Sequence, residues 1–383
     1  MKQMLPFIFL ALAAVSAMAQ DISSDMKAAF ANQDYRTTID LAQSCYEADS
    51  TNLDCLDLLA KASNKSGDQA NAKRYLHILE KKDTSNTDVL VQLASIYEQQ
   101  QLIGRAIKYY TLLNKVMPDN PLFYRKNAKL YLTYGDKPKS FQLYSKAHQL
   151  NPRDVLSLKG LAELALANRQ PFLADSLVGV ALDLDSMNIS INYLQAKVKY
   201  KQKNYAEVIS VFDRIRGKVD LNSYYNKMLG YAYLQVDSVD LAISKLQLAI
   251  VDDNNPEKLH YYLATAYEKK GNIEGALEHH NIASESAISP DIDIYYRNIG
   301  RIALKEKRYK QAISAYQDAY KYDQDPVVLY YLAAATDNYY KDKSIALRYY
   351  KKYLKSNHNH TEYRDYAQQR VRYLKEKLHL QKK

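Results

Sequence analysis

The sequence has no tryptophan and little glycine, proline or cysteine. Its 383 residues include only 10 Gly, 9 Pro and 2 Cys. Sandwiches, barrels and doubly wound sheets need frequent turns, which are rich in Gly and Pro. The scarcity of both residues argues against these folds.

Long uninterrupted apolar runs are also missing after the first nineteen residues, so no transmembrane helix is expected there. The chain begins with a basic residue, Lys2, followed by an apolar run over 5–15 and the small residues Ala17 and Ala19. This order predicts a secretory signal peptide over residues 1–19, of bacterial type. No Cys follows the predicted cleavage point, so a lipid anchor is not expected. We therefore expect a soluble, exported, periplasmic protein.

Tyrosine, by contrast, is abundant, with 36 Tyr against 7 Phe, and 47% of the residues are hydrophobic. This apolar content excludes a wholly disordered chain. Most of the tyrosines are expected at half-buried contacts between helices, where the ring is apolar and the hydroxyl stays polar.

A period of 34 residues runs through the chain after residue 19. Each unit carries two small residues twelve positions apart, which are Ala60 and Ala72, Ala94 and Ala106, Ala128 and Ser140, Ala162 and Ala174, Gly230 and Ala242, Ala264 and Ala276, Gly300 and Ala312, and Ala334 and Ala346. One slip of two residues falls between Ala264 and Gly300. Ten units fill the chain to about residue 360. Units 19–52 and 189–222 fit the frame least well.

Each unit reads as two helices joined by short connections of two to four residues. Leu90, Leu93, Ala94 and Tyr97 recur at helical spacing. Small residues are needed where two helices cross closely, because longer side chains would push the backbones apart. The pattern predicts an all-α chain of stacked helix pairs.

The pattern resembles the tetratricopeptide repeat (TPR) family over nearly everything after residue 19. The unit 87–120 has Ala94, Tyr97, Ala106, Tyr110 and Pro118 at the family's small, aromatic and proline positions. The resemblance implies a right-handed superhelical solenoid of helix-turn-helix repeats over residues 20–360. A concave groove would be lined mainly by first helices. Residues 361–383 are expected to form a capping helix with a basic tail, because terminal repeats must cover an apolar face.

Motifs of catalysis and cofactor binding are lacking, and the expected short connections have no room for an inserted active site. We therefore expect no enzymatic activity, no cofactor and no metal site. His260 and His280 fall in one repeat on facing helices and are expected to touch. Packed neutral imidazoles are favoured there over a metal or pH-sensing site.

The resemblance instead points to a protein-interaction scaffold, part of a cell-envelope assembly, that binds a protein or peptide segment in the groove. Unit positions place these residues on the groove-facing stripe: Tyr193, Lys197, Tyr200, Tyr224, Lys227, Tyr231, Tyr261, Arg297, Arg301 and Lys305. The alternative is a glycan or peptidoglycan-associated protein that stacks sugars on the groove tyrosines.

Positive charge is concentrated at the C-terminal end. Residues 297–383 have a net charge of +11, and residues 1–296 a net charge of −1. A block of this kind favours a partner with acidic segments, or contact with an anionic membrane surface. Nucleic acid is not an expected partner of an exported protein.

The two cysteines, Cys45 and Cys55, are predicted to lie on antiparallel neighbouring helices, about equally far from the turn between them. Export would permit oxidation, so they form a candidate disulfide. The alternative is two small buried thiols.

Overall fold

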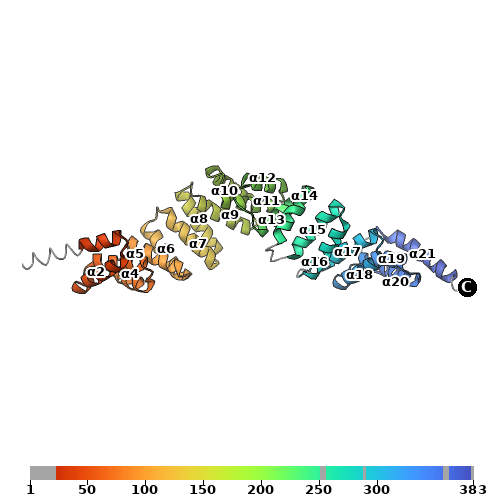
Figure 1. Ribbon diagram of the computed structural model, residues 1–383, viewed down its shortest axis with the longest axis horizontal. Coiled ribbons are helices and arrows are strands. Elements are labelled where there is room, and N and C mark those ends of the chain that lie inside the picture. Colours follow the sequence, from red (N-terminus) through yellow and green to blue (C-terminus); the bar gives the residue numbers. More distant parts are fainter. Residues whose placement is uncertain (1–22, 251–255, 288–289, 357–361, 381–383) are drawn as a thin grey trace, which may run out of the picture. The chain divides into compact units, whose positions relative to one another are not determined.

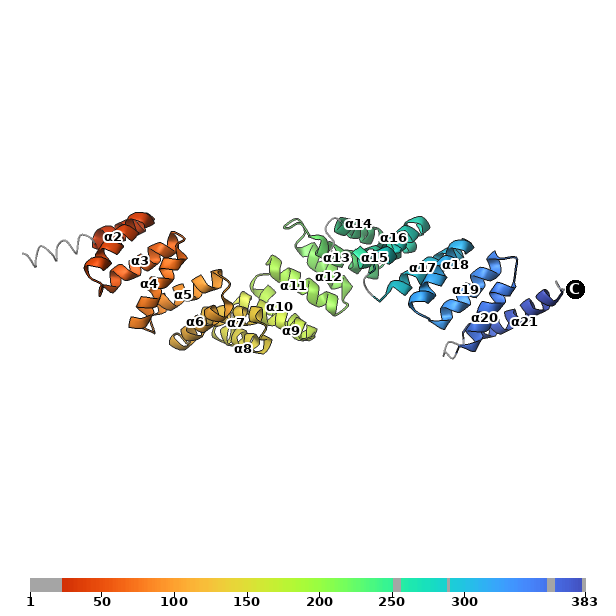
Figure 2. The ribbon, with the colours of Figure 1, turned by 90° about the horizontal axis from the view of Figure 1, so that it is seen from below.

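The computed structural model describes residues 23–250, 256–287, 290–356 and 362–380. The predicted signal peptide lies outside them. Every regular element in these ranges is a helix (Figures 1 and 2), and residues 23–31 are helical before α2. The further helices are α2 (Tyr35–Ala48), α3 (Leu53–Lys65), α4 (Gln69–Lys82), α5 (Thr87–Gln99), α6 (Ile103–Val116), α7 (Pro121–Tyr134), α8 (Lys137–Leu150), α9 (Val155–Ala167), α10 (Pro171–Leu184), α11 (Ile189–Lys201), α12 (Tyr205–Arg214), α13 (Ser223–Gln235), α14 (Val239–Ala249), α15 (Pro256–Lys270), α16 (Ile273–Glu285), α17 (Ile292–Lys305), α18 (Tyr309–Tyr322), α19 (Pro326–Tyr339), α20 (Ser344–Lys355) and α21 (Arg364–Leu380).

The chain divides into two compact units, residues 1–186 and 187–383. We call them unit 1, which holds α2–α10, and unit 2, which holds α11–α21. Within each unit, every helix packs against the helix before it and the helix after it, and a few contacts reach the second neighbour, as between α13 and α15. The predicted all-α solenoid of helix pairs is confirmed. None of the helices in the described ranges is both long and apolar enough to cross a bilayer.

The helices start where the sequence provides Asp or Asn as a cap. The side chains of Asp34, Asn86 and Asp136 each accept a hydrogen bond from the backbone N–H three residues later. These bonds satisfy donors that the first helical turn leaves open. Pro121 and Pro326 occupy the first turn of α7 and α19, where no backbone donor is needed.

The turn inside every described helix pair except α19–α20 repeats one backbone conformation. Residues with positive φ recur at Gln33, Gly67, Gln101, Gly135, Arg169, Lys203, Asp237 and Gly271, and then at Lys307. The first eight are spaced 34 residues apart, and the last follows the predicted slip of two. At Gly135, where φ is 97°, the left-handed residue ends α7 and its N–H bonds to the carbonyl of Leu132. The period inferred from small residues is therefore present in the backbone.

The small residues are buried where helices cross, as predicted. Ala94 and Ala106 have no exposed surface, and Gly300 lies directly against Tyr316. A Cβ at Gly300 would come 2.7 Å from the Tyr316 ring, so only glycine fits there without movement. Ala334 is half-buried, unlike its counterparts.

One connection is longer than predicted in the 34-residue repeat 189–222, which fits the sequence period poorly. Helix α12 ends at Arg214, and residues 215–222 separate it from α13, whereas two to four residues were predicted. The longer path is anchored by Ile215, which is 1% exposed, and it turns at Gly217, where φ is 74°. The sequence prediction of uniformly short connections is wrong here.

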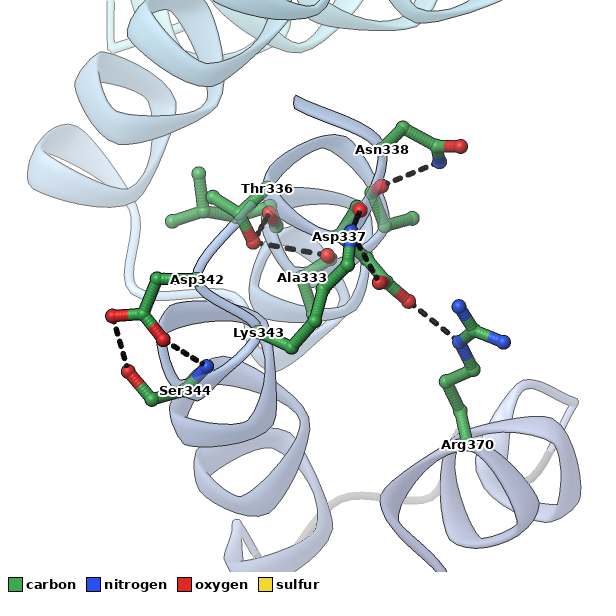
Figure 3. Close-up of polar contacts among 10 residues, drawn as sticks. Ala333, Thr336, Asp337, Asn338, Asp342, Lys343, Ser344 and Arg370 are labelled. Atoms are coloured by element: carbon green, nitrogen blue, oxygen red, sulfur yellow. Dashed lines mark hydrogen bonds and ion pairs between the residues drawn. The ribbon is translucent and has the colours of Figure 1, made fainter. Parts of the chain in front are cut away.

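The last helix, α21, closes the end of unit 2. It buries Ala367, Val371 and Leu374 in a cluster with residues of α19 and α20. Figure 3 shows a polar contact beside this cluster. The side chain of Asp337, on α19, lies between Lys343, which precedes α20, and Arg370, which is on α21. The Arg370 Nε donates to the Asp337 carboxylate at 2.6 Å, and the carboxylate is almost fully buried.

Candidate functional site

Tyrosines gather on the first helices of unit 2. Tyr193 of α11 stacks on Tyr225 of α13, with ring centroids 4.0 Å apart and planes inclined by 10°. The Lys197 ammonium lies over Tyr224 and Tyr225, at 5.4 and 5.6 Å from the ring centroids. Tyr224 is 51% exposed. This end of the cluster therefore presents an accessible aromatic ring beside a cation.

A second group of contacting tyrosines lies on α11, α12, α13 and α15. Tyr200, Tyr205 and Tyr231 contact one another with centroids 5.6–5.9 Å apart, and Tyr231 lies 4.5 Å from Tyr262 of α15. Burial raises the pKa of Tyr231 to about 12, and it raises the pKa of Tyr200 as well. Both hydroxyls therefore stay protonated at physiological pH, as the hydroxyl of an exposed tyrosine also does.

The cluster extends to α17 through Tyr261, whose ring centroid lies 5.3 Å from that of Tyr295 and 5.9 Å from that of His280. We call the tyrosines of these two groups, together with Tyr261, the tyrosine strip. It consists of Tyr193, Tyr200, Tyr205, Tyr224, Tyr225, Tyr231, Tyr261 and Tyr262. All but Tyr205, which begins α12, come from α11, α13 and α15.

The predicted groove cations fall into two groups. Arg301 makes two hydrogen bonds of 2.7 Å to Glu268, and Arg297 bonds to Asp293 and, at 2.8 Å, to Asp325. The hydrogen bond from Arg301 lowers the pKa of Glu268. Both guanidinium charges are therefore balanced within the protein. Lys305 is exposed at the end of α17, and Lys227 is half-buried on α13.

Three strip residues were missed by the sequence analysis, namely Tyr205, Tyr225 and Tyr262. Two of them belong to doublets of adjacent tyrosines. Doublets occur on four successive first helices, at 224–225, 261–262, 295–296 and 330–331. This recurrence was a usable signal, because adjacent helical residues point about 100° apart and can extend one surface around the helix. Tyr205 had no such signal, since it belongs to a second helix.

The histidine contact differs from the prediction. The Nδ1 atoms of His260 and His279 lie 2.9 Å apart, whereas His280 is 1% exposed and packs beside Tyr261. The expected contact between His260 and His280 is wrong, because adjacent residues of α16 point in different directions and His279 faces α15. Burial lowers the pKa of His280 to about 4. Across the described ranges, no three His, Cys, Asp or Glu side chains converge as metal ligands would.

The two cysteines are joined in the structure. Cys45 of α2 and Cys55 of α3 form a disulfide, with Cα atoms 6.0 Å apart. That separation is typical of a bridge between neighbouring helices.

Unit 1 carries a more polar surface on its first helices. A hollow of about 500 Å³ lies over α3 and α5, lined by Phe30, Lys61, Asn64, Lys65, Asp88, Val91, Gln92 and Ser95. No tyrosine lines it, and Lys61 bonds to Asp57 at 2.7 Å. This hollow on α3 and α5 therefore differs from the tyrosine strip of unit 2.

Comparison with known proteins gives a family and a set of similar folds. Residues 261–327 match the family model described as tetratricopeptide repeat. No curated protein sequence matches the chain.

Solved structures similar to this chain share little sequence with it. A structure described as YrrB, a TPR protein with an unusual peptide-binding site, is 20% identical and covers 50% of this chain and 96% of its own, with a TM-score of 0.44. The C-terminal part of a TPR repeat-containing protein from Cytophaga hutchinsonii is 15% identical and covers 64% and 98%, with a TM-score of 0.49. A tetratricopeptide repeat protein from Parabacteroides merdae is 16% identical and covers 74% and 98%, with a TM-score of 0.40.

The matched segment runs from α15 to the start of α19, and it lies inside the frame of helix pairs and left-handed turns that recurs in both units. Residues 261–327 therefore belong to the tetratricopeptide repeat family, and the same frame of helix pairs continues on both sides of them.

Proposed function

We propose that this chain is a non-enzymatic scaffold that binds a segment of another protein along the tyrosine strip, as an exported part of a cell-envelope assembly. The observation that carries the proposal is the two groups of contacting tyrosines on α11, α13 and α15, with Tyr224 exposed beside Lys197. Rigid aromatic side chains provide contact area at low entropic cost, and they are enriched among residues that dominate binding energy.

The contacts of the strip favour a protein segment over a sugar. A sugar-stacking platform needs a free ring face, but Tyr193 and Tyr225 cover each other and Lys197 lies over Tyr225. Tyr200 and Tyr231 are half-buried against each other and against Tyr205, so their rings offer no open face either. A glycan is therefore the second candidate.

The predicted preference for acidic segments now depends on the lysines more than on the arginines. Arg297 and Arg301 would have to exchange their own carboxylate partners for those of a ligand, which offsets most of the gain. Lys197 and Lys305 are the better candidates to orient acidic groups.

The test is capture of partners from envelope extract by the full chain and by two variants. The site variant combines Lys197→Ala with Tyr224→Ala. The matched control is Tyr134→Ala, since Tyr134 is a 68% exposed tyrosine of unit 1. We expect the site variant to lose a polypeptide that the wild type and the control retain, by a factor of about ten or more. Retention of every polypeptide by the site variant, or capture of glycan alone by the wild type, would contradict the proposal.

A further inference from the structure

A basic stripe runs along the exposed face of α20, the second helix of its pair. Arg348, Lys351, Lys352 and Lys355 are all exposed, and their spacing of three and four residues places them on one side of the helix. Together with Ser344 and Leu347 they line a shallow hollow of about 420 Å³. The opposite face of α20 is buried through Ala346, Tyr350 and Tyr353.

The four cations of this stripe have no acidic partner among the residues that the structure describes. The segment 357–361, which lies outside them, contains no Asp or Glu. The nearest acid in the sequence, Asp342, is engaged by the N–H and the hydroxyl of Ser344, at 2.9 and 2.8 Å.

Several other cations of this end of the chain are paired with carboxylates. Lys343 and Arg370 share Asp337, Arg308 pairs with Glu274, and Arg301 pairs with Glu268. The α20 stripe differs from these pairs because it gathers four exposed cations on one helix face with no acidic partner among the described residues, so it can attract an anionic partner.

Aromatic rings hold two of the cations in place. The Lys352 ammonium lies 4.5 Å from the ring centroid of Tyr320 of α18, and the Arg348 guanidinium lies 5.4 Å from that of Tyr349. These contacts restrict the long side chains before any ligand binds, which reduces the entropic cost of binding.

The stripe suits a chain segment better than a membrane surface. The hollow is concave, and its one apolar residue, Leu347, is half-buried rather than exposed. Binding at a membrane interface usually adds an exposed apolar residue that inserts among the lipids, and α20 has no exposed large hydrophobic residue.

We propose that the α20 stripe is a second interaction site, which binds an acidic segment of a partner protein. It is separate from the tyrosine strip and does not depend on the function proposed for it. Arg348 and Lys355 are about 10 Å apart along the helix axis, which corresponds to about three residues of extended chain. Carboxylates at alternate positions of an extended segment therefore fall within reach of both.

The test measures binding of a labelled peptide of alternating Glu and Ser to the full chain at low ionic strength, with a Gln-Ser peptide as the uncharged comparison. The site variant is Arg348→Glu with Lys355→Glu. The matched control is Lys139→Glu with Lys146→Glu, which changes the net charge equally, at the same spacing, on exposed positions of α8 in unit 1. Circular dichroism checks that both variants keep their helicity.

We expect the site variant to bind the Glu-Ser peptide at least about tenfold more weakly, the control to change by less than about twofold, and Tyr224→Ala to have no effect. Equal losses in the two charge variants would mean that the net charge acts rather than the stripe, and would overturn the proposal. Unchanged binding by the site variant would also overturn it. So would binding of the wild type to phosphatidylglycerol vesicles without binding to the peptide, because the ligand would then be a lipid surface.

Discussion

At the residue scale, close helix crossings in this fold depend on glycine, which has no side chain. Gly300 allows Tyr316 to pack directly against the backbone of α17. In the same way, Gly230 allows Leu246 of α14 to pack against the backbone of α13. Tyr316 is 1% exposed, so it has little freedom to move aside. Close helix crossings of this kind tolerate no added volume.

Gly300→Ala is expected to lower the free energy of unfolding by about 1–3 kcal/mol, because the new methyl group overlaps the Tyr316 ring. The control is Gly179→Ala on α10, where a Cβ meets nothing within 4 Å. That change should raise stability by about 0.5–1 kcal/mol, because alanine favours the helix. Urea unfolding of both variants measures the difference. Equal effects of the same sign would show that packing at Gly300 is loose.

His280 is expected to make stability depend on pH, because burial lowers its pKa to about 4. In the unfolded chain its pKa is about 6.5. Between these values the unfolded state holds a proton that the folded state lacks, so the free energy of unfolding falls as the pH is lowered. From about pH 7 to pH 5 the contribution of His280 is a loss of about 2 kcal/mol.

The measurement compares urea unfolding of the wild type and of His280→Phe at both pH values. The carboxylates are common to the two proteins, so their contributions cancel in the comparison. The variant should lose about 2 kcal/mol less than the wild type on acidification. An identical loss in both proteins would mean that His280 takes up its proton in the folded state.

At the scale of elements, helix ends are fixed by local capping, whereas the last helix is held by contacts far apart in the sequence. Helix α21 packs Ala367, Val371 and Leu374 on the preceding pair, and Arg370 bonds to Asp337 thirty-three residues earlier. Asp337 is 5% exposed, so its charge depends on Arg370 and Lys343.

Asp337→Ala is expected to lower the free energy of unfolding by roughly 2–3 kcal/mol, because it leaves two cations without a partner. The cost is below that of a fully buried pair, since the Arg370 side chain is 32% exposed. Hydrogen exchange should accelerate in α19, α20 and α21 and stay unchanged in unit 1. Asp323→Ala, at an exposed position at the end of α18, is the control. Protection of α21 at the wild-type level would show that its apolar stripe alone holds it.

The link between α2 and α3 gives another prediction at this scale. Cys45→Ser combined with Cys55→Ser should lower the free energy of unfolding by about 2.5–3 kcal/mol on the chain-entropy model of a short loop. Urea unfolding measures the loss, and titration of the denatured, unreduced protein should find no free thiol. Two free thiols in protein purified from its own compartment would mean that the pair is not oxidised there.

At the scale of the whole molecule, one backbone turn is repeated and contacts remain between near neighbours. Nine of the described helix pairs have a left-handed residue in the turn between their two helices, and only three of these residues are glycine, namely Gly67, Gly135 and Gly271. Other residues pay a conformational cost there that glycine does not. Because helices contact only near neighbours, a gain in one unit should remain in that unit.

Gln101→Gly combined with Arg169→Gly is therefore expected to stabilise unit 1 by about 0.5–1 kcal/mol per site. Lys203→Gly with Lys307→Gly should do the same for unit 2. Hydrogen exchange resolved by segment measures each unit separately. Equal stabilisation of both units by either pair would contradict nearest-neighbour folding.

Much of the fold was predictable because the same 34-residue pattern of small and apolar residues recurs many times in the sequence. The burial of Ala94, Ala106 and their counterparts followed from spacing alone. The site was less predictable. The position of each residue within its 34-residue repeat predicted Tyr193 and Tyr224 as site residues, but it did not predict Tyr225, which stacks on Tyr193. The position of a residue along one helix does not determine which ring it meets on another helix. The contact of His260 with His279 instead of His280 has the same cause.

The sequence by itself determined the helical class, the 34-residue frame and the crossing positions, since these depend on local spacing, small residues and caps. Only the tertiary structure decided which charges are balanced. The sequence suggests that Arg297 and Arg301 are free groove cations, but the structure pairs them with carboxylates far away in the sequence. Arg297 bonds to Asp325, 28 positions later, and Arg301 bonds to Glu268, 33 positions earlier. Among the residues that the structure describes, the α20 stripe has no such carboxylate neighbours, so its charge is not neutralised there. Spacing along the chain fixes a helix face, but only the packing of different helices brings an acid to a base or leaves the base exposed.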